Sequence, residues 1–351
     1  MNVGMIGLGK LGLPVALAIE AAGHNVFGYD ASEKVMSILA TRELPYREEG
    51  AQQLLRHSKI KTMTPPDIAK VCDLIFVAVQ TPHQSEFEGT TRLPEERADF
   101  DYTHLVDAVE SVGFQAKCPI VVISTVLPGT MNRLFPFASA HLLYNPFFIA
   151  MGTTIPDFRD PEFVLIGTDG AVPGPLIDFY KTIHERPAFV TTIKTAELTK
   201  VAYNTFIGLK IAFANTMMEL CEKTGADVDD LVDALSLADK RLLSPAYLRG
   251  GMGDGGGCHP RDNIALSWLA REHNLSYDLF SALMKCREKQ TEWLAWLMYR
   301  TWKTGGDIEI LGKAYKPGTN LTVGSPATLL GNILSENGVE FTHTDPYVEV
   351  E

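Results

Sequence analysis

The first 23 residues constrain the fold more than any other part of the chain. The apolar run "NVGMI" leads directly into "GLGKLG", and the apolar run "LPVALAIEAAG" follows. Gly7, Gly9 and Gly12 therefore form a G-x-G-x-x-G pattern after a predicted strand and at the start of a predicted helix. Such glycines allow a tight turn and the close approach of a pyrophosphate to a helix N-terminus. We expect a Rossmann-type unit that binds a dinucleotide at Gly7, Gly9, Leu11 and Gly12.

The second predicted strand indicates which dinucleotide is bound. The segment "NVFGYD" ends at Asp30, which is the acid expected about 20 residues after the glycine pattern. A carboxylate at this place accepts hydrogen bonds from the ribose hydroxyls and repels a 2′-phosphate. We therefore expect NAD rather than NADP as the cofactor.

Strand-like and helix-like segments alternate over the first half of the chain. Further strands are predicted at 73–79, 119–125, 141–146, 162–167 and 188–193, with helical text such as 101–114 between them. Strands that are separated by helices pair in parallel, so the fold class is α/β with a doubly wound sheet. We place an NAD-binding Rossmann-type domain at residues 1–192.

The middle of the chain is predicted to be helical. Residues 195–224 contain few helix breakers, with Thr195 as the expected cap and Gly225 as the expected stop. A helix of this length is roughly 45 Å long and suits a spine between domains or subunits. Further helices are predicted at 227–237, 262–274 and 276–305, the last of them largely buried. We place a central helical domain, for dimerisation and substrate binding, at residues 193–305.

The last part of the chain returns to alternating structure. A strand at 308–315, a helix at 325–338 and a strand at 339–347 form one βαβ unit in a predicted domain of residues 306–351. Two strands are too few for an independent sheet. We expect the unit to pack on the preceding helices, or the chain to be shorter than its architecture normally is.

Composition excludes several classes of partner. The chain has 31 basic and 43 acidic residues, a net charge of −12, which argues against nucleic acid and anionic membranes. No apolar run approaches a membrane span and no signal-peptide pattern is seen at the start, so a cytoplasmic location is expected. The five cysteines are odd in number and far apart, which disfavours disulfides and a zinc site. Four of them are expected to be small buried residues: Cys72, Cys118, Cys221 and Cys286.

Two places in the central region carry candidate chemistry. Lys200 and Asn204 are spaced i, i+4, so they share a helix face and can together hold a substrate hydroxyl as its hydride leaves. An ordinary solvated helix face is the alternative, which spacing alone does not exclude.

The second place is the stretch "GDGGGCHPRD". Cys258 follows several glycines, which let the backbone wrap around a ligand, and Arg261 is close enough in sequence to favour a thiolate nucleophile. A glycine-rich surface loop that contains a cysteine by chance is the alternative. No further ligands lie at metal-binding spacing from Cys258 and His259, so no metal is expected.

At this point the sequence resembles the nucleotide-sugar 6-dehydrogenases, the family of UDP-glucose and GDP-mannose dehydrogenases. "VAVQTP" (77–82) is similar to the family's V-x-T-P, "STVLPGT" (124–130) to S-T-V-x-x-G-T, and "GGGCHPRD" to G-G-S-C-F-P-K-D. "AELTKVAYNTFIGLKIAFAN" is similar to the family's central helix and "LGKAYKPGTN…SPA" to the start of its third domain. These motifs occur in the family's order along nearly the whole chain.

The resemblance implies oxidation of a sugar primary alcohol to a carboxylate with two NAD⁺. It implies that Cys258 forms a thiohemiacetal and then a thioester, that Lys200 and Asn204 polarise the substrate oxygen, and that Asp262 helps to activate water. It also implies a homodimer built on the central helix. The cofactor contacts implied are Val79, Thr81, Pro82 and Thr125, of which Thr125 is also implied as a catalytic residue beside the reacting carbon. The substrate contacts implied are Asn145, Phe147, Lys200, Asn204, Gly255, Arg261 and Lys316.

Several positions depart from the family pattern. N-P-E-F-L-R-E-G reads "NPFFIAMG", so Phe147 replaces the glutamate credited with activating water, and Ala150 and Met151 replace the arginine and second glutamate. Val323 and Arg261 replace a family arginine and a family lysine. These changes leave three hypotheses: a four-electron oxidation of a nucleotide sugar or related sugar through Cys258, a two-electron dehydrogenase that stops at the aldehyde or ketone, and an NAD-binding homologue with impaired catalysis.

Overall fold

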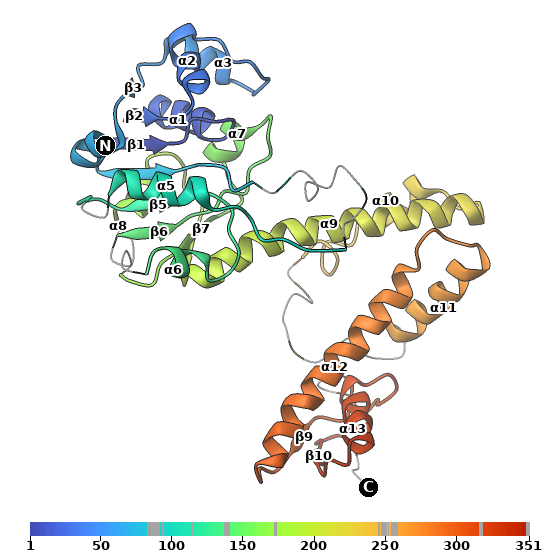
Figure 1. Ribbon diagram of the computed structural model, residues 1–351. Coiled ribbons are helices and arrows are strands. Elements are labelled where there is room, and N and C mark those ends of the chain that lie inside the picture. Colours follow the sequence, from blue (N-terminus) through green and yellow to red (C-terminus); the bar gives the residue numbers. More distant parts are fainter. Residues whose placement is uncertain are drawn as a thin grey trace. The chain divides into compact units, whose positions relative to one another are not determined.

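The computed structural model describes residues 1–82, 84, 92, 95–113, 116–136, 141–171, 174–244, 246, 251, 253, 259–315 and 319–348. The chain separates into two compact units, Met1–Phe206 and Ile207–Glu351 (Figure 1). The domain boundaries predicted after residues 192 and 305 stay predictions.

The first unit contains an eight-stranded sheet with the order β3-β2-β1-β4-β5-β6-β7-β8. Neighbouring strands are parallel except for β6 and β7, which pair antiparallel. The predicted doubly wound α/β fold is therefore confirmed. Its strands are β1 (Asn2–Ile6), β2 (Asn25–Tyr29), β3 (Lys61–Thr62), β4 (Leu74–Val77), β5 (Ile120–Val122), β6 (Leu142–Tyr144), β7 (Val164–Gly167) and β8 (Ala188–Thr191).

The sequence did not predict β3 because this strand has two residues, both exposed, and no apolar pattern. It pairs with β2 through Phe27 opposite Lys61 and Gly28 opposite Thr62. Strand order reverses at β1, which has β2 on one side and β4 on the other. In such sheets, the ligand lies at this reversal, beyond the carboxyl ends of the strands.

Helices cover both faces of the sheet (Figure 1). They are α1 (Gly12–Ala21), α2 (Glu33–Thr41), α3 (Ala51–His57), α4 (Pro65–Val71), α5 (Thr103–Val112), α6 (Thr130–Leu134), α7 (Thr154–Arg159) and α8 (Gly174–Lys181). Successive residues of a strand point to opposite faces. Accordingly, Leu74 and Phe76 belong to the core under α1, α7 and α8, whereas Ile75 and Val77 belong to the core under α4 and α5.

The long helix α9 (Ile193–Thr224) begins two residues before its predicted cap. The side chain of Asp169 accepts a hydrogen bond from Ile193 N, and the Thr192 hydroxyl accepts one from Thr195 N. The prediction that Thr195 caps the helix was therefore wrong. The start of α9 packs tightly on β7, because a Cβ on Gly167 would lie 2.9 Å from Ala196 Cβ.

The second unit contains the rest of the predicted helices and the C-terminal βαβ segment. Its elements are α10 (Val228–Ser236), α11 (His259–Glu272), α12 (Leu279–Lys303), β9 (Glu309–Leu311), α13 (Pro326–Glu336) and β10 (Thr342–Thr344). Strands β9 and β10 form a parallel pair. Ala295 of α12 shares a hydrophobic core with Leu330 and Leu334 of α13, which confirms that the βαβ segment packs on the preceding helix.

Two predictions about burial were wrong. Helix α12 is less buried than its apolar sequence suggested, since Trp293 and Trp296 are 58% and 51% exposed. Cys286 of the same helix is also exposed, although Cys72, Cys118 and Cys221 are buried as predicted. The apolar pattern of α12 thus exceeds what one copy of this unit covers. None of the described helices combines the length and the apolar character needed to cross a membrane.

Candidate active site

The glycine pattern forms the turn between β1 and α1. A side chain would have a different effect at each of its three glycines. Gly7 has φ +95°, and a Cβ there would meet Ala78 O at 2.4 Å. A Cβ on Gly12 would lie 1.9 Å from Gly7 O, whereas a Cβ on Gly9 would meet nothing within 4 Å. The protein's own packing therefore requires Gly7 and Gly12. Gly9 faces open space, which fits close approach of a ligand to the backbone.

The N-terminus of α1 is available to an anion. Leu11 precedes the helix without a side-chain hydrogen bond that caps it, and the first turn contains no acidic residue. The free N–H groups and the positive end of the helix dipole favour a phosphate at this place.

Asp30 directly follows β2 and is held in a fixed orientation. One carboxylate oxygen accepts from Leu8 N and the other from Ser32 N, both at 2.8 Å. Each carboxylate oxygen can accept more than one hydrogen bond, so the ribose hydroxyls can still bind. These features of the turn, of α1 and of Asp30 fit NAD, which supplies a hydride acceptor when it is bound.

A cleft of about 490 Å³ lies beside this turn. Gly7, Gly9, Asp30 and Val79, four of the predicted cofactor residues, line it. Helix α5 adds His104, Asp107 and Ser111, which sequence reasoning missed. These residues belong to an ordinary amphipathic helix, so the sequence held no signal for them.

The loops that follow β4 and β5 are tied to each other beside the cleft. Ser124 donates its hydroxyl to Val79 O at 2.6 Å, and Thr81 donates its hydroxyl to Thr125 O at 2.8 Å. Pro82 O accepts from Asp101 N. The structure thus brings together the predicted cofactor residues of the two motifs, with Thr125 half-buried at the strand end.

Lys200 is a buried lysine on α9. Its Nζ donates to Phe147 O at 2.7 Å and lies 5.2 Å from the centre of the Phe148 ring. It forms no ion pair with any described residue. Burial lowers the pKa of the Lys200 ammonium from its ordinary value. A desolvated ammonium without a carboxylate partner interacts strongly with negative charge that develops on a substrate oxygen.

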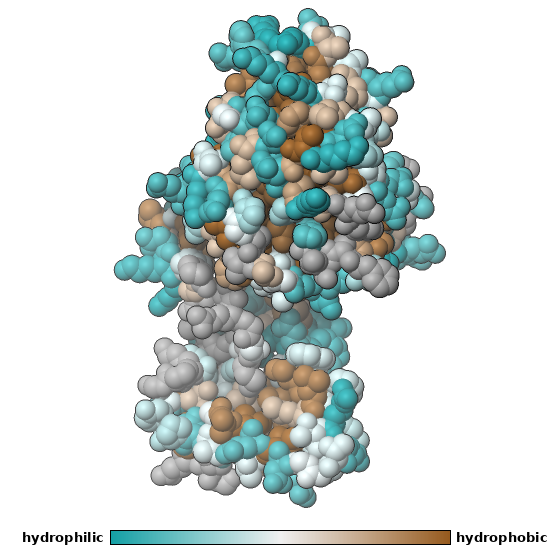
Figure 2. All heavy atoms as spheres, turned by 90° about the vertical axis from the view of Figure 1, so that its left-hand side faces the viewer, coloured by the Kyte–Doolittle hydropathy of each residue, from teal (hydrophilic) through white to brown (hydrophobic). Residues whose placement is uncertain are grey.

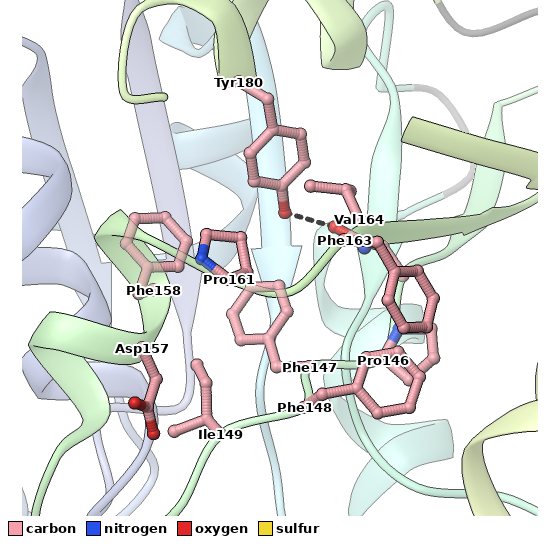
Figure 3. A pocket seen from close by; sticks show the side chains of 11 residues that line it. Pro146, Phe147, Phe148, Ile149, Asp157, Phe158, Pro161, Phe163, Val164 and Tyr180 are labelled. Carbon is pink, nitrogen blue, oxygen red and sulfur yellow. Dashed lines mark hydrogen bonds between the residues drawn. The ribbon is translucent and has the colours of Figure 1, made fainter. Parts of the chain in front are cut away.

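The two phenylalanines of "NPFFIAMG" point to different surroundings (Figure 3). The Phe147 ring packs against Phe76 and Phe158, with ring centres 6.4 and 5.5 Å apart. The Phe148 ring packs against Phe163 and Tyr203. The cavity between them measures only about 20 Å³, which is room for about one water molecule. The partly buried Phe147 ring therefore packs against the core, and its backbone carbonyl is the part that faces Lys200.

Asn145 is fully buried and its amide is used inside the protein. Its Nδ2 donates to Leu165 O at 2.7 Å, and its Oδ1 accepts from the Tyr180 hydroxyl. These bonds fix the chain just before Phe147. Asn145 thus orients the backbone at this site in the described structure.

The remaining predicted residues lie at the surface or outside the described residues. Asn204 is exposed on α9, one turn after Lys200. Arg261 and Asp262 are exposed in the first turn of α11 and pair with each other at 3.3 Å. Cys258, Gly255 and Lys316 lie outside the described residues. Among the described residues, no group of three His, Cys, Asp or Glu side chains is placed to hold a metal ion.

The C-terminal βαβ segment repeats the hydrogen bonds of the glycine turn. Gly7 N donates to Tyr29 O, and Leu8 N donates to Asp30. In the second unit Gly312 N donates to Thr344 O at 2.7 Å and Lys313 N donates to Asp345 at 2.7 Å. Both glycines have positive φ, 95° and 92°. The second unit therefore repeats the local geometry of the glycine turn, with an acid at the same place.

Two residues of α9 were not predicted as part of the site. Glu197 is completely buried and accepts N–H bonds from the segment after Thr125. Tyr203 donates to Glu162 at 3.1 Å and packs on Phe148. Glu197 lies in the mixed segment "KTAELTK" at the start of a predicted helix, so the sequence held no distinct signal for it.

The glycine turn, Asp30 and the paired strand-end loops define an NAD-binding dehydrogenase domain. The NAD-binding domain of the UDP-glucose/GDP-mannose dehydrogenase family matches residues 1–184, and the central domain of the same family matches residues 194–289. The chain belongs to this family, and NAD is its cofactor class. The resemblance read from the motifs is thereby confirmed.

Individual relatives support this membership. The chain is 31% identical to a UDP-glucose 6-dehydrogenase of Rickettsia prowazekii, over 99% of this chain and 81% of that protein. It is 29% identical to one of Rhizobium meliloti over 99% and 82%. A crystal structure of GDP-mannose dehydrogenase from Pseudomonas aeruginosa superimposes with a TM-score of 0.86 at 26% identity, over 98% of this chain and 80% of that one.

Proposed function

We propose that this protein oxidises the primary alcohol of a nucleotide sugar, or of a related sugar, to the carboxylate with two equivalents of NAD⁺. Cys258 is the nucleophile that holds the intermediate aldehyde as a thiohemiacetal and the acyl group as a thioester. The observation that carries this proposal is Lys200, a buried ammonium without a described carboxylate partner, on the helix that begins against the NAD-binding unit.

The chain's own residues have separable tasks in this proposal. Lys200 donates to the substrate oxygen and stabilises the negative charge that grows there as the hydride leaves. Asn204 projects from the same face of α9 and orients that oxygen. Thr125 lies at the end of β5, and we assign it contact with the reacting carbon and the cofactor. Asp262 serves as the base for the water that hydrolyses the thioester.

A nucleotide sugar is favoured by the hydrogen-bond repeat in the second unit. Asp345 occupies the place that Asp30 has in the NAD-binding turn. A βαβ segment of this kind suits recognition of a nucleotide. The similar proteins named above are a UDP-glucose 6-dehydrogenase and a GDP-mannose dehydrogenase, and both UDP-glucose and GDP-mannose are nucleotide sugars.

A second candidate function is favoured by Phe147. Where the family pattern has a glutamate, this chain has an aromatic ring that packs against Phe76 and Phe158. Loss of a general base lowers a rate by about 10²–10⁴-fold. A slow hydrolysis step would leave the enzyme acylated at Cys258 after both hydrides have been transferred. A two-electron dehydrogenase would instead release the aldehyde before any second hydride transfer, so that no thioester forms and no base is needed.

The stoichiometry of NADH separates these candidates. The protein is incubated with UDP-, GDP- and other nucleotide sugars, NADH is counted per substrate consumed, and intact mass is recorded during turnover. Two NADH per substrate, with activity lost in Cys258→Ser, supports the first function. One NADH per substrate, with Cys258→Ser still active, supports the second. NAD binding without turnover on any sugar would favour an impaired homologue.

A second copy of the chain is the partner that we propose for α9. Hydrophobic side chains reach the surface of both units (Figure 2), and several lie on this helix. The exposed large apolar residues of α9 are Leu198, Phe206, Ile207, Leu209, Ile211, Phe213 and Met218. Exposed apolar surface of this extent marks an interaction site. Sedimentation at micromolar concentration tests it, and a monomer would contradict the proposal.

A further inference from the structure

Glu197 connects the helix that carries Lys200 to the segment that carries Thr125. Its side chain is 0% exposed. One carboxylate oxygen accepts from Met131 N at 2.8 Å, and the other accepts from Gly129 N. Residues three apart on a helix lie on the same side, so Glu197 and Lys200 project together from α9. Bonds from backbone N–H groups to a buried carboxylate are strong and directional.

The segment that Glu197 holds is in turn tied to the cofactor cleft. Ser124 donates to Val79 O, and Val79 lines the cleft. Thr81 donates to Thr125 O. Hydrogen bonds at both ends of residues 124–131, together with the backbone between them, therefore connect α9 to the wall of the cleft. No other described side chain of α9 bonds to residues 124–131.

Packing alone does not account for a carboxylate at this position. Burial is the largest effect on Glu197 and raises its pKa, whereas the N–H bonds from Met131 and Gly129 lower it. Of the charged groups nearby, Asp169 raises this pKa and Lys194 lowers it. An apolar residue would fill the same space without desolvating a charge. The carboxylate accepts from the N–H groups of Gly129 and Met131, which an apolar residue would leave without this acceptor, and it holds residues 129–131 at a defined distance from α9.

We propose that Glu197 is a positioning residue that fixes Lys200 relative to Thr125, and so aligns the substrate carbon with the cofactor. This inference rests on the proposed function, because it takes Lys200 and Thr125 to face the same substrate. Displacement of a reacting group by about 1 Å can lower a rate by about 10²-fold. A hydrogen-bonded connection that keeps the two residues in place is therefore expected to raise kcat by a large factor.

The variant Glu197→Gln tests this role with little change in shape. Its amide oxygen can accept from one N–H, but its NH₂ group meets the other N–H without accepting from it. Glu48→Gln is a matched control, because Glu48 accepts from Gly152 N and Thr154 N at 3.0 and 2.6 Å. Each variant removes one of the two hydrogen bonds that its carboxylate accepts from backbone N–H groups. The two sites lie far apart in the chain.

Three measurements are made on the full-length protein. Amide hydrogen exchange of the unliganded variants reports the held segments, NADH titration reports cofactor affinity, and kcat reports alignment. For Glu197→Gln we expect faster exchange in residues 124–131, NADH affinity weakened by several-fold, and kcat lowered about 10- to 100-fold. For Glu48→Gln we expect faster exchange near residues 152–154 and NADH affinity within twofold of the wild type.

A double-variant cycle separates positioning from simple stability. If Glu197 acts through Thr125, Glu197→Gln lowers kcat much less in a Thr125→Ala background than in the wild type. Unchanged kcat and NADH affinity in Glu197→Gln, with only a lower melting temperature, would overturn the proposal. If that variant does not fold, Glu197→Asp keeps the charge but cannot reach both N–H groups, and wild-type kcat in Glu197→Asp would be equally decisive.

Failure of this inference differs from failure of the proposed function. If the wild type makes no NADH from any sugar, the proposed function fails. The exchange pattern and NADH affinity of Glu197→Gln and Glu48→Gln still show whether Glu197 holds the wall of the cofactor cleft.

Discussion

Lys200 donates its ammonium hydrogen bond to the carbonyl oxygen of Phe147, at 2.7 Å, rather than to a carboxylate. The side chain that replaces the family glutamate points into the core, while its backbone holds the lysine that is expected to act on the substrate. Two consequences follow from this contact. Under the proposed function, the Lys200 ammonium meets the substrate oxygen without a carboxylate partner among the described residues, and thioester hydrolysis needs a base other than residue 147.

Replacing Lys200 with Met separates charge from size at this site. We expect kcat to fall about 10²–10³-fold, because the donor that stabilises the developing charge is lost. Steady-state turnover with the best nucleotide sugar measures the loss. Lys181→Met, at an exposed lysine of α8, is the control and should stay within twofold. Full activity of Lys200→Met would remove Lys200 from the mechanism.

We also expect Lys200→Met to change the way in which stability to unfolding depends on pH. Burial lowers the folded-state pKa of Lys200, so its stabilising contribution is complete above the unfolded pKa of about 10.5 and is lost as pH falls through the folded value. At pH 7 the wild type therefore carries the cost of a desolvated charge. Thermal unfolding measures this effect. We expect the melting temperature of Lys200→Met, relative to that of the wild type, to be higher at pH 7 than at pH 10. A difference independent of pH would show that the ammonium is not desolvated.

Restoring the family glutamate is expected to fail. Phe147→Glu would place a carboxylate among Phe76, Phe158 and their neighbours, whereas Lys200 contacts the backbone oxygen of residue 147 and not its side chain. Loss of the ring and burial of a charge together cost about 3–5 kcal/mol. Phe147→Leu, which keeps an apolar side chain, should cost about half as much. Chemical denaturation measures both, and a stable Phe147→Glu with faster thioester release would show that the core can open at this point.

The sequence predicted the cofactor side of the site better than the substrate side. Gly7, Gly9 and Asp30 could be placed because a strand, a turn and a helix in series leave one geometry for a dinucleotide. The orientation of Phe147 could not be predicted, since it depends on rings from β4 and α7 that are far apart in sequence. Glu197 was missed for the same reason: its partners, Gly129 and Met131, are brought to it only by the fold.

In the C-terminal segment, the sequence predicted the secondary structure but not the hydrogen bonds at the strand ends. Strand, helix and strand were predicted correctly from their apolar pattern, yet the repeat of the Asp30 arrangement at Asp345 appeared only in the hydrogen bonds. Burial on α12 was overestimated because an apolar sequence does not say whether the same chain or another covers it. Local pattern thus determined the elements, and contacts between distant segments determined the site.

Substitutions at two glycines of the turn separate NAD binding from folding of the NAD-binding unit. Gly12→Ala would place a Cβ 1.9 Å from Gly7 O, so we expect it to destabilise the NAD-binding unit strongly, with a large fall in melting temperature. Gly9→Ala would meet no protein atom within 4 Å, so its melting temperature should stay close to that of the wild type. Because the added methyl group points into the space that the pyrophosphate would occupy, NADH should bind at least about tenfold more weakly. Thermal unfolding without ligand and NADH fluorescence titration measure the two effects. If Gly9→Ala binds NADH as tightly as the wild type, the cofactor does not approach the backbone at this turn.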